Sequence, residues 1–373
     1  MSAAQSPAKR TPLYEVHQAL GANLVEFAGF MMPLRYGSET AEHQAVRTAA
    51  GLFDLSHMGE IFLSGPGAAA TLDYALVGYI SALRVGRARY TMICDAAGGV
   101  LDDLIVYRLA PETFMVVANA ANVATVRAAL IERAENFDAA VDDRSDSYAL
   151  IAVQGPNAQQ ILAKHTDAPL ADLKYYAIMA EQVTGIDALL ARTGYTGEDG
   201  FELFVTASDA VRVWRELAQS PGLTPAGLSA RDTLRLEAGM PLYGNELSTE
   251  TTPYDAGLGR VVKLEKPGDF VGRAALAARA DTPAGRTLVG LVARGRRVLR
   301  PGYDVVTRGE HGGTPCGVVT SGAPSPTLGK PIAMAYLNAE TGPDNPWGDL
   351  AVDVRGKHEP VDVVDLPFYR RPS

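Results

Sequence analysis

Three short apolar runs separated by two polar turns stand out near residue 100. The first turn reads Asp-Ala-Ala-Gly-Gly and the second reads Ala-Pro-Glu-Thr. Short apolar runs bounded by glycine, proline and acidic residues are typical of strands joined by tight turns. The pattern predicts a β-meander whose strands cover residues 90–94, 100–109 and 114–119.

Two other segments of the chain look alike. Residues 61–72 read as a short apolar strand, a Gly-Pro turn and a helix, and residues 151–162 repeat this order. Proline is favoured in the first turn of a helix because its missing N–H costs nothing there. Two related α+β units would explain the likeness, and a chance match over so short a stretch is the alternative.

Further helices are predicted at residues 123–135, 208–217 and 228–237, with Ser208 as the N-cap of the second. A cluster of proline, glycine and arginine at residues 281–286 indicates a linker. The short apolar runs that follow are broken by glycine and proline, which favours a small all-β barrel or sandwich at the C-terminus. These runs cover residues 287–292, 316–320 and 331–337, and a last run at residues 360–369 would close the barrel.

The composition narrows the classes of function. The chain has 373 residues, 47% of them hydrophobic, and its 34 Lys and Arg against 43 Asp and Glu give a net charge of −9. A protein that reads mainly nucleic-acid phosphates needs the opposite balance. Apolar stretches such as residues 113–126 stop short of the roughly 18 residues that a membrane-spanning helix needs. We therefore expect no nucleic-acid partner and no membrane span.

The spacing of cysteine and histidine argues against a metal site. Cys94 and Cys316 lie far apart, and no two of the six histidines are three to five residues apart. We expect no disulfide framework, no structural zinc and no multi-histidine metal site, and a cytoplasmic location fits best. Residues 1–10 are polar and lack the apolar core of a secretory signal, so they are predicted to be a disordered tail.

Common catalytic fingerprints are missing. The sequence has no Gly-x-Gly-x-x-Gly, no Walker loop, no Gly-x-Ser-x-Gly and no His-Glu-x-x-His. Their absence argues against a Rossmann dehydrogenase, a P-loop enzyme, a lipase-like hydrolase and a common zinc protease. Candidate chemistry must come from less regular patterns.

The first candidate is the acidic pair Asp102-Asp103 inside the predicted strand 100–109. Successive strand side chains face opposite ways, so Asp103 shares its face with Ile105 and Tyr107. A carboxylate beside a tyrosine and a branched aliphatic side chain suits the floor of a site for a flat heterocycle. The alternative is that both aspartates end a turn and are solvated.

The second candidate is Glu202, which follows a glycine-rich loop and begins an apolar strand. A buried carboxylate must be paired or hydrogen-bonded. The two parallel N–H donors of a 2-aminopyrimidinone edge would satisfy it in bidentate fashion. A salt bridge to a nearby arginine is the alternative.

Two arginine-rich segments complete the candidates. Arg231 and Arg235 share a face of a helix that Ser229 would cap, and either they form local pairs or Arg231 binds an anionic or carbonyl group of a ligand. The basic segment, residues 294–300, contains four arginines in an acidic chain. Such a run is either a solvated face or a surface that attracts an acidic partner.

These segments resemble those of a known family. From about Thr11 to Tyr369 the chain is similar to the T protein of the glycine cleavage system, a family of aminomethyltransferases. The similarity is carried by co-linear motifs at residues 27–34 (Phe-Ala-Gly-Phe-Met-Met-Pro-Leu), 53–60 (Phe-Asp-Leu-Ser-His-Met-Gly-Glu), 98–104 (Gly-Gly-Val-Leu-Asp-Asp-Leu), 194–200 (Gly-Tyr-Thr-Gly-Glu-Asp-Gly), 235–239 (Arg-Leu-Glu-Ala-Gly) and 320–328 (Thr-Ser-Gly-Ala-Pro-Ser-Pro-Thr-Leu).

The resemblance implies an α+β fold and a reaction. Its fold would be a three-domain cloverleaf around a central tetrahydrofolate site, with two α+β domains built on antiparallel sheets and a small C-terminal β-barrel. The domains would span residues 11–145, which can interleave with the next, then 146–280 and 286–373. An aminomethyl group on the lipoyl arm of H protein would pass to tetrahydrofolate, giving 5,10-methylenetetrahydrofolate, ammonia and the dihydrolipoyl protein. The enzyme would be a monomer or a weak dimer.

By motif position, Asp103 corresponds to the family's catalytic aspartate. It would hydrogen-bond or deprotonate a folate nitrogen and stabilise positive charge as the amine leaves. Glu202 resembles the glutamate that grips the pterin edge, and His57 is interpreted as structural. The other folate-binding residues that the resemblance implies are Asn119, Arg231, Tyr90, Tyr107, Tyr195, Ile105, Met58 and Tyr369.

Three related classes are alternatives. Folate-dependent demethylases share the fold and take a one-carbon group from a small molecule. Sarcosine and dimethylglycine oxidases carry a similar module behind a flavin domain, for which this chain has no dinucleotide fingerprint. A non-catalytic folate-binding maintenance protein carries a Lys-Gly-Cys-Tyr-x-Gly-Gln-Glu motif, and neither Cys94 nor Cys316 lies in such a context.

Overall fold

The computed structural model describes residues 7–282, 285–308, 313–338 and 348–372. The chain forms two compact units, each assembled from three separate segments. Unit 1 comprises Met1–Ala68, Leu83–Arg89 and Ile105–Asp232, and unit 2 comprises Ala69–Ala82, Tyr90–Leu104 and Thr233–Ser373. The division into three domains stays a prediction.

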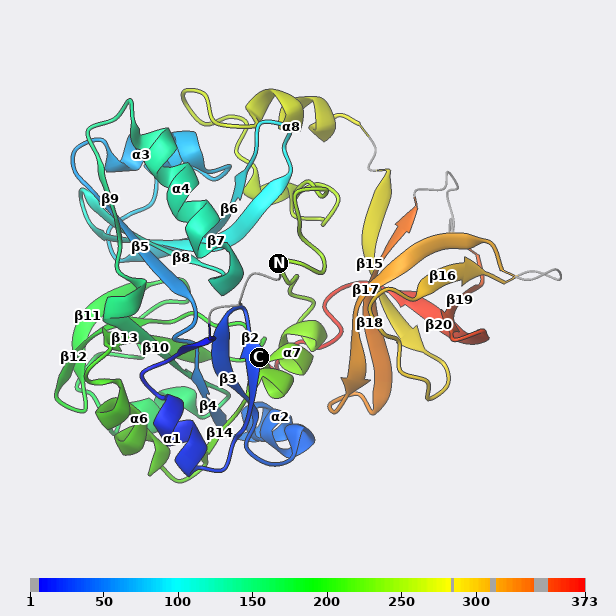
Figure 1. Cartoon of the computed structure of the whole chain (residues 1–373), viewed down its shortest axis with the longest axis horizontal. Helices are drawn as coiled ribbons and strands as arrows, with labels where there is room; N and C mark the ends of the chain where they lie inside the picture. The colour runs from blue at the N-terminus through cyan, green and yellow to red at the C-terminus, as the bar shows by residue number, and fades with distance from the viewer. Residues whose placement is uncertain (1–6, 283–284, 309–312, 339–347, 373) are drawn as a thin grey trace. The chain divides into compact units, whose positions relative to one another are not determined.

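The predicted meander is confirmed as part of a five-stranded sheet with the order β6-β7-β8-β5-β9 (Figure 1). A second, six-stranded sheet has the order β11-β12-β13-β10-β4-β14. The strands of the first sheet are β5 (Gly59–Ser64), β6 (Arg87–Cys94), β7 (Val100–Ala110), β8 (Thr113–Ala118) and β9 (Ala140–Asp143). Those of the second are β4 (Ala50–Asp54), β10 (Tyr148–Gln154), β11 (Ile178–Val183), β12 (Ile186–Ala191), β13 (Gly200–Thr206) and β14 (Leu223–Pro225).

The two segments that look alike in sequence also share a topology. Strand β5 leads through Gly65 into helix α3 (Ala68–Ala75), and β10 leads through Gly155 into α5 (Ala158–Leu162). Both glycines have positive φ, +117° and +142°, which L side chains rarely adopt. In each case three strands follow the helix and the third pairs with the first strand, giving β6-β7-β8-β5 and β11-β12-β13-β10. This common order favours duplication over a chance match.

A small three-stranded sheet, β1-β3-β2, begins unit 1. Its first strand is Lys9–Arg10, so the predicted disordered tail is wrong for these two residues, while residues 1–6 lie outside the described part of the chain. Lys9 pairs with Phe30 in register, which anchors the chain there. The remaining elements are α1 (Tyr14–Ala19), β2 (Asn23–Phe27), β3 (Phe30–Arg35) and α2 (Glu39–Thr48).

The later helices lie close to where the sequence predicts them, but both predicted serine caps are wrong. The N-cap of α6 is Asp209, and the Ser208 hydroxyl instead hydrogen-bonds that of Thr206 at 3.0 Å. Ser229 is the second residue of α7, so it lies inside the helix that it was expected to cap. The helices are α4 (Val123–Ala134), α6 (Ala210–Ala218), α7 (Leu228–Glu237) and α8 (Arg273–Ala280).

A closed barrel forms the C-terminal part, which confirms the α+β class with a C-terminal β-barrel and decides against a sandwich. Its strands are antiparallel in the order β15-β18-β17-β16-β19-β20. The last strand pairs with the first, but it ends at Val364, so residues 365–369 leave the barrel. The strands are β15 (Arg286–Ala293), β16 (Asp304–Thr307), β17 (Pro315–Ser325), β18 (Lys330–Asn338), β19 (Leu350–Val354) and β20 (Lys357–Val364).

Within unit 2, the end of α7 is fastened to the barrel. The Glu237 carboxylate accepts hydrogen bonds from the hydroxyl groups of Ser325 and Thr327, at 2.5 and 2.7 Å. Arg235 donates to Ser321 at 2.8 Å and to Glu246 at 3.1 Å. These contacts give the motifs at residues 235–239 and 320–328 a structural role. In the described residues no helix is long and apolar enough to cross a bilayer.

Candidate functional site

Glu202 occupies the third position of β13, between two alanines. Its register partners are Ala152 on β10 and Ala191 on β12. Residues paired across strands lie on the same face of a sheet, and alanine extends only one methyl group from it. The glutamate side chain therefore has room beside it, although it is only 8% exposed.

Two hydroxyl groups hold one oxygen of this carboxylate. Thr193 donates to Oε2 of Glu202, and Tyr107 donates to the same atom at 3.3 Å. Among the described residues no donor reaches Oε1 and no arginine forms an ion pair with Glu202, so the alternative interpretation, a salt bridge to arginine, does not hold. Burial raises the pKa of Glu202, while Thr193, the Arg231 charge and Tyr107 act in the opposite direction. The arrangement presents Oε1 as an acceptor for a ligand's N–H.

The glycine-rich loop before β13 is fixed by Gln154. The Gln154 amide donates to the carbonyl of Thr193 and accepts from the Thr196 hydroxyl, both at 3.0 Å. A Cβ atom on either Gly194 or Gly200 would overlap this amide, which explains why glycine stands at both positions. The loop therefore holds Thr193 against Glu202 and sets the position of Tyr195.

Arg231 lies over the ring of Tyr195, with 4.7 Å between the guanidinium carbon and the ring centroid. Both side chains are half-buried. Such a cation–π pair orients the guanidinium and leaves its N–H groups able to hydrogen-bond. With Glu202 and Tyr107, unit 1 thus supplies a hydrogen-bond acceptor, a cation and two tyrosine rings. The Arg231 charge also acts to lower the pKa of Glu202.

Asn119, Met58 and His57 also belong to unit 1. Asn119 follows β8 and precedes a short 3₁₀ helix, Ala120–Asn122, and Met58 is a half-buried residue in the turn before β5. His57, beside Met58, is 3% exposed, and its Nδ1 has no hydrogen-bond partner among the described residues. Sequence reasoning assigned no ligand contact to this histidine.

In unit 2, Asp103 accepts a hydrogen bond from Tyr90. The distance from the Tyr90 hydroxyl to Oδ2 of Asp103 is 3.0 Å. Asp102 is fully buried and Asp103 is half-buried, as the alternation along the strand predicts. Ile105, two residues on, is also half-buried. The reading in which both aspartates are solvated is therefore wrong for Asp102.

Tyr243 is a candidate that sequence reasoning missed. Burial raises its pKa, and the charges of Asp102 and Asp103 add to this effect. Its segment shows neither strand nor helix periodicity, so no local pattern could place it beside the aspartates.

Tyr369, also in unit 2, donates its backbone N–H to the carbonyl of Glu237 at 2.8 Å, at the end of α7.

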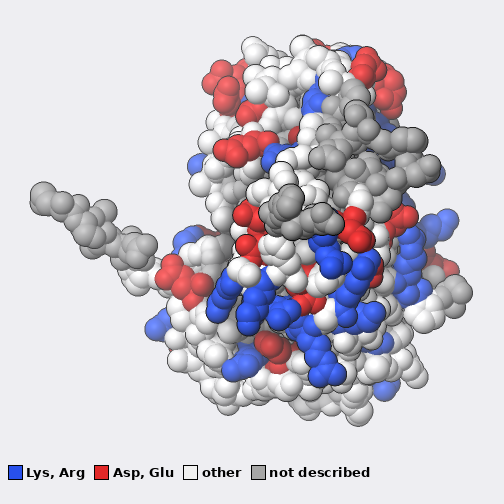
Figure 2. Space-filling view, turned by 90° about the vertical axis from the view of Figure 1, so that its right-hand side faces the viewer, with Lys and Arg blue, Asp and Glu red and all other residues white. Residues whose placement is uncertain are grey.

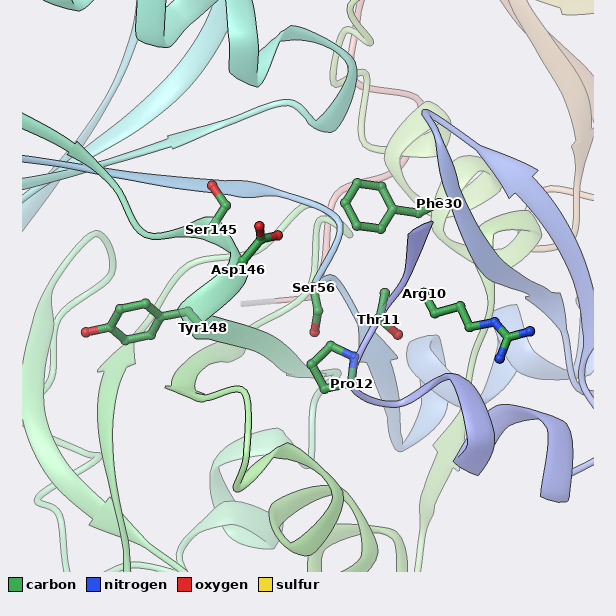
Figure 3. Close-up of a pocket in the computed structure, with 8 residues that line it drawn as sticks. All are labelled: Arg10, Thr11, Pro12, Phe30, Ser56, Ser145, Asp146 and Tyr148. Atoms are coloured by element: carbon green, nitrogen blue, oxygen red, sulfur yellow. The ribbon is translucent and has the colours of Figure 1, made fainter. Parts of the chain in front are cut away.

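A cavity of about 210 Å³ lies elsewhere in unit 1 (Figure 3). Phe30, Ser56 and Asp146 are among its lining residues, and the predicted site residues are not. The guanidinium of Arg10 extends away from the Asp146 carboxylate, so the two charges do not face each other across the cavity (Figure 3). In the described residues no cluster of three or more His, Cys, Asp or Glu could hold a metal ion.

In unit 1, Glu202 offers Oε1 to an N–H donor beside the Tyr107 ring, and Tyr195 holds the Arg231 guanidinium over its own ring. The Asp103–Tyr90 pair of unit 2 supplies a fixed carboxylate. The roles of all these residues stay predictions.

Comparisons with known proteins match the whole fold. The family described as "GCVT N-terminal domain" covers residues 13–266, and "Glycine cleavage T-protein C-terminal barrel domain" covers residues 286–370. An "Aminomethyltransferase" of Saccharopolyspora erythraea is 62% identical over 369 residues, which is 98% of this chain and 99% of that protein. One of Streptomyces avermitilis is 63% identical, over 97% of this chain and 98% of its own length. The crystal structure of glycine cleavage system aminomethyltransferase T from Bartonella henselae is similar with a TM-score of 0.89 at 37% identity, covering 97% of this chain and 98% of that chain.

Proposed function

The chain belongs to the glycine cleavage T-protein family and is an aminomethyltransferase, and we propose that tetrahydrofolate is its one-carbon acceptor and lipoylated H protein its aminomethyl carrier. The observation that carries the proposal is the buried Glu202 carboxylate, which offers Oε1 beside an aromatic ring. A buried carboxylate is costly unless N–H or O–H donors satisfy it. An N–H donor of a pterin edge would satisfy Oε1.

Asp103 is the proposed catalytic residue. During transfer the carbon–sulfur and carbon–nitrogen bonds of the carrier's aminomethyl group break, and two carbon–nitrogen bonds form to the acceptor. The two protons lost by the acceptor nitrogens end on the departing ammonia and on the released thiol. A carboxylate held by Tyr90 at 3.0 Å can accept such a proton and stabilise the positive charge that develops at the reacting carbon.

The proposed binding residues come from both units. In unit 1, Glu202 and Asn119 would bind the pterin edge and Arg231 a carbonyl or anionic group, and the other contacts would come from Tyr107, Tyr195, Ile105 and Met58. In unit 2, Tyr90 and Tyr369 would contact the ligand. We also propose a monomer or weak dimer and a cytoplasmic location, and the second proposal agrees with Cys94 and Cys316 being reduced thiols.

The decisive experiment measures ammonia release from aminomethylated H protein with and without tetrahydrofolate. We expect strong release only when both are present. Release that is indifferent to tetrahydrofolate would contradict the acceptor, and release from a small methylated amine but not from the carrier would contradict the partner. Calorimetric titration with tetrahydrofolate alone separates a failure to bind from a failure to react.

A further inference from the structure

His57 carries a buried ring nitrogen, Nδ1, that has no hydrogen-bond partner among the described residues. The side chain is 3% exposed. Its ring lies edge-on to that of Phe27, with 5.6 Å between the centroids. Buried polar atoms are nearly always hydrogen-bonded, so an exception indicates a group that a ligand or water satisfies.

The comparison with His17 makes the exception clear. His17 is fully buried in the same unit, but its Nε2 lies 2.9 Å from Asp54 and its Nδ1 lies 2.8 Å from the Tyr36 hydroxyl. Asp54 also accepts from Thr11 at 2.7 Å. The fold therefore satisfies both ring nitrogens of His17, whereas Nδ1 of His57, only three residues from Asp54 in sequence, has no hydrogen-bond partner among the described residues.

The electrostatic surroundings of His57 keep its ring neutral. Burial lowers the pKa of His57 to about 4, with the Arg231 guanidinium acting in the same direction and Asp54 opposing it. At neutral pH the imidazole thus carries one N–H donor and one lone pair. The same Arg231 stacks on Tyr195, and its charge acts to lower the pKa of Glu202. His57, Arg231, Tyr195 and Glu202 therefore belong to one part of unit 1.

We propose that His57 is a further tetrahydrofolate-binding residue, whose Nδ1–H donates a hydrogen bond to a carbonyl or carboxylate oxygen of the folate that Arg231 also attracts. A cation beside a neutral N–H donor selects an oxygen acceptor with negative charge density, and the aromatic ring of Tyr195 beneath the guanidinium favours a flat ligand. This inference rests on the proposed function, because it names a contact to the same acceptor.

The proposal predicts opposite effects on stability and on binding. An unsatisfied buried polar atom lowers the stability of the ligand-free protein, so replacing the ring with a flat apolar one relieves that cost. The same replacement removes the contact to the ligand. A purely structural histidine would show the reverse, a loss of stability without a specific loss of binding.

The test uses the full-length protein, calorimetric titration with tetrahydrofolate and thermal unfolding without ligand. For His57→Phe we expect an unfolding temperature equal to or above that of the unmodified enzyme and an affinity lowered about tenfold, the loss of one well-placed hydrogen bond. His57→Asn places an amide where Nδ1 lies and should recover most of the affinity. His57→Gln places it near Nε2 and should not.

Thr184→Val is the matched control. The Thr184 hydroxyl is another buried atom of unit 1 without a partner among the described residues, and a β-branched residue already stands at its positive φ of 54°. This variant should gain stability and keep its folate affinity. His57→Phe binding within twofold of the unmodified enzyme, or Asn and Gln variants that bind equally weakly, would overturn the proposal. If the unmodified enzyme itself did not bind tetrahydrofolate, the proposed function would fail instead.

Discussion

Tyr90 donates a hydrogen bond of 3.0 Å to Oδ2 of Asp103, and this bond joins β6 to β7 at the proposed catalytic carboxylate. Asp102, on the opposite face of the same strand, is fully buried, whereas Asp103 is only half-buried. The strand therefore separates two adjacent carboxylates into one that belongs to the core and one that a substrate can reach. The tyrosine holds the second in a fixed orientation.

Replacing Asp103 tests its catalytic role. For Asp103→Asn we expect aminomethyl transfer to fall by roughly 10³-fold, within the range that a positioned acid–base group contributes, while tetrahydrofolate still binds. Single-turnover ammonia release and calorimetric binding measure the two properties separately. Asp102→Asn is the control. It should lower the free energy of unfolding and leave the rate constant of transfer nearly unchanged. Turnover of Asp103→Asn within a few-fold of the unmodified enzyme would show that the assignment is wrong.

The raised pKa of Glu202 predicts a pH dependence of folate binding. Oε1 accepts an N–H donor best when the carboxylate is ionised, and burial raises the pKa of Glu202 above its ordinary value. Affinity should therefore fall as the pH is lowered from 7.5 to 5.5. Glu202→Gln should bind weakly at both pH values and lose this dependence, and Glu202→Ala should bind weakly as well. A titration in which both variants match the unmodified enzyme would contradict the pterin-edge role.

Part of this site is visible in the sequence because strand alternation is a local property. The alternation separates Asp102 from Asp103, and the turn residues around the meander fix the strand that carries them. Long-range contacts are not visible in this way. Tyr243 reaches the aspartates from a segment without periodicity. Whether Nδ1 of His57 finds a hydrogen-bond partner depends on all the elements around it, and among the described residues none supplies one.

The predicted helix caps show a second limit. Ser208 lies one position before the N-cap residue of α6, Asp209. Ser229 lies two positions after the residue that precedes α7, so the helix that begins at Leu228 includes it. Helix boundaries depend on how the preceding loop is held, and tertiary contacts determine the position of that loop. The strand before α7, β14, for example, pairs in parallel with β4, with Leu223 opposite Ala50.

Gly194 offers a test of the loop that carries Tyr195. For Gly194→Ala we expect a loss of about 1–3 kcal/mol in the free energy of unfolding, because the new methyl group displaces the Gln154 amide from its two hydrogen bonds. Folate affinity should fall as well, since Thr193 and Tyr195 flank the substitution. Gly37→Ala is the control, because a Cβ there meets no atom within 4 Å. Equal unfolding curves for the two variants would contradict the close contact.

Loss of one member of the buried pair Arg235–Glu246 should destabilise unit 2 more than loss of both. Both side chains are almost fully buried, 3.1 Å apart. Removing one partner leaves an uncompensated charge, so Arg235→Met should cost about 3–5 kcal/mol in the free energy of unfolding. The double variant Arg235→Met/Glu246→Leu should recover much of that loss, and Arg294→Met, at an exposed pair, should change little. Urea unfolding measures the free energy of each variant. A loss in the double variant equal to the sum of the losses in Arg235→Met and Glu246→Leu would contradict the coupling.

The basic segment, residues 294–300, is predicted to contribute to H-protein docking through only two of its arginines. Arg294 is paired with Asp362 at 2.8 Å and Arg297 with Glu359 at 2.9 Å, so their charges are partly neutralised. Arg296 and Arg300 are exposed and form no ion pair with the described residues. The face in Figure 2 carries Lys and Arg side chains interspersed with acidic ones, which makes local pairing more informative than the number of charges.

Charge reversal at these two arginines tests the surface. Arg296→Glu/Arg300→Glu should raise the KM for aminomethylated H protein about three- to tenfold at low salt and weaken its salt dependence, because steering by exposed charges is screened within a Debye length. The KM for tetrahydrofolate should not change. Arg127→Glu/Arg215→Glu, at exposed arginines of α4 and α6, is the matched control for net charge. If both charge variants raise the carrier's KM equally, the effect comes from net charge and the segment is not a docking surface.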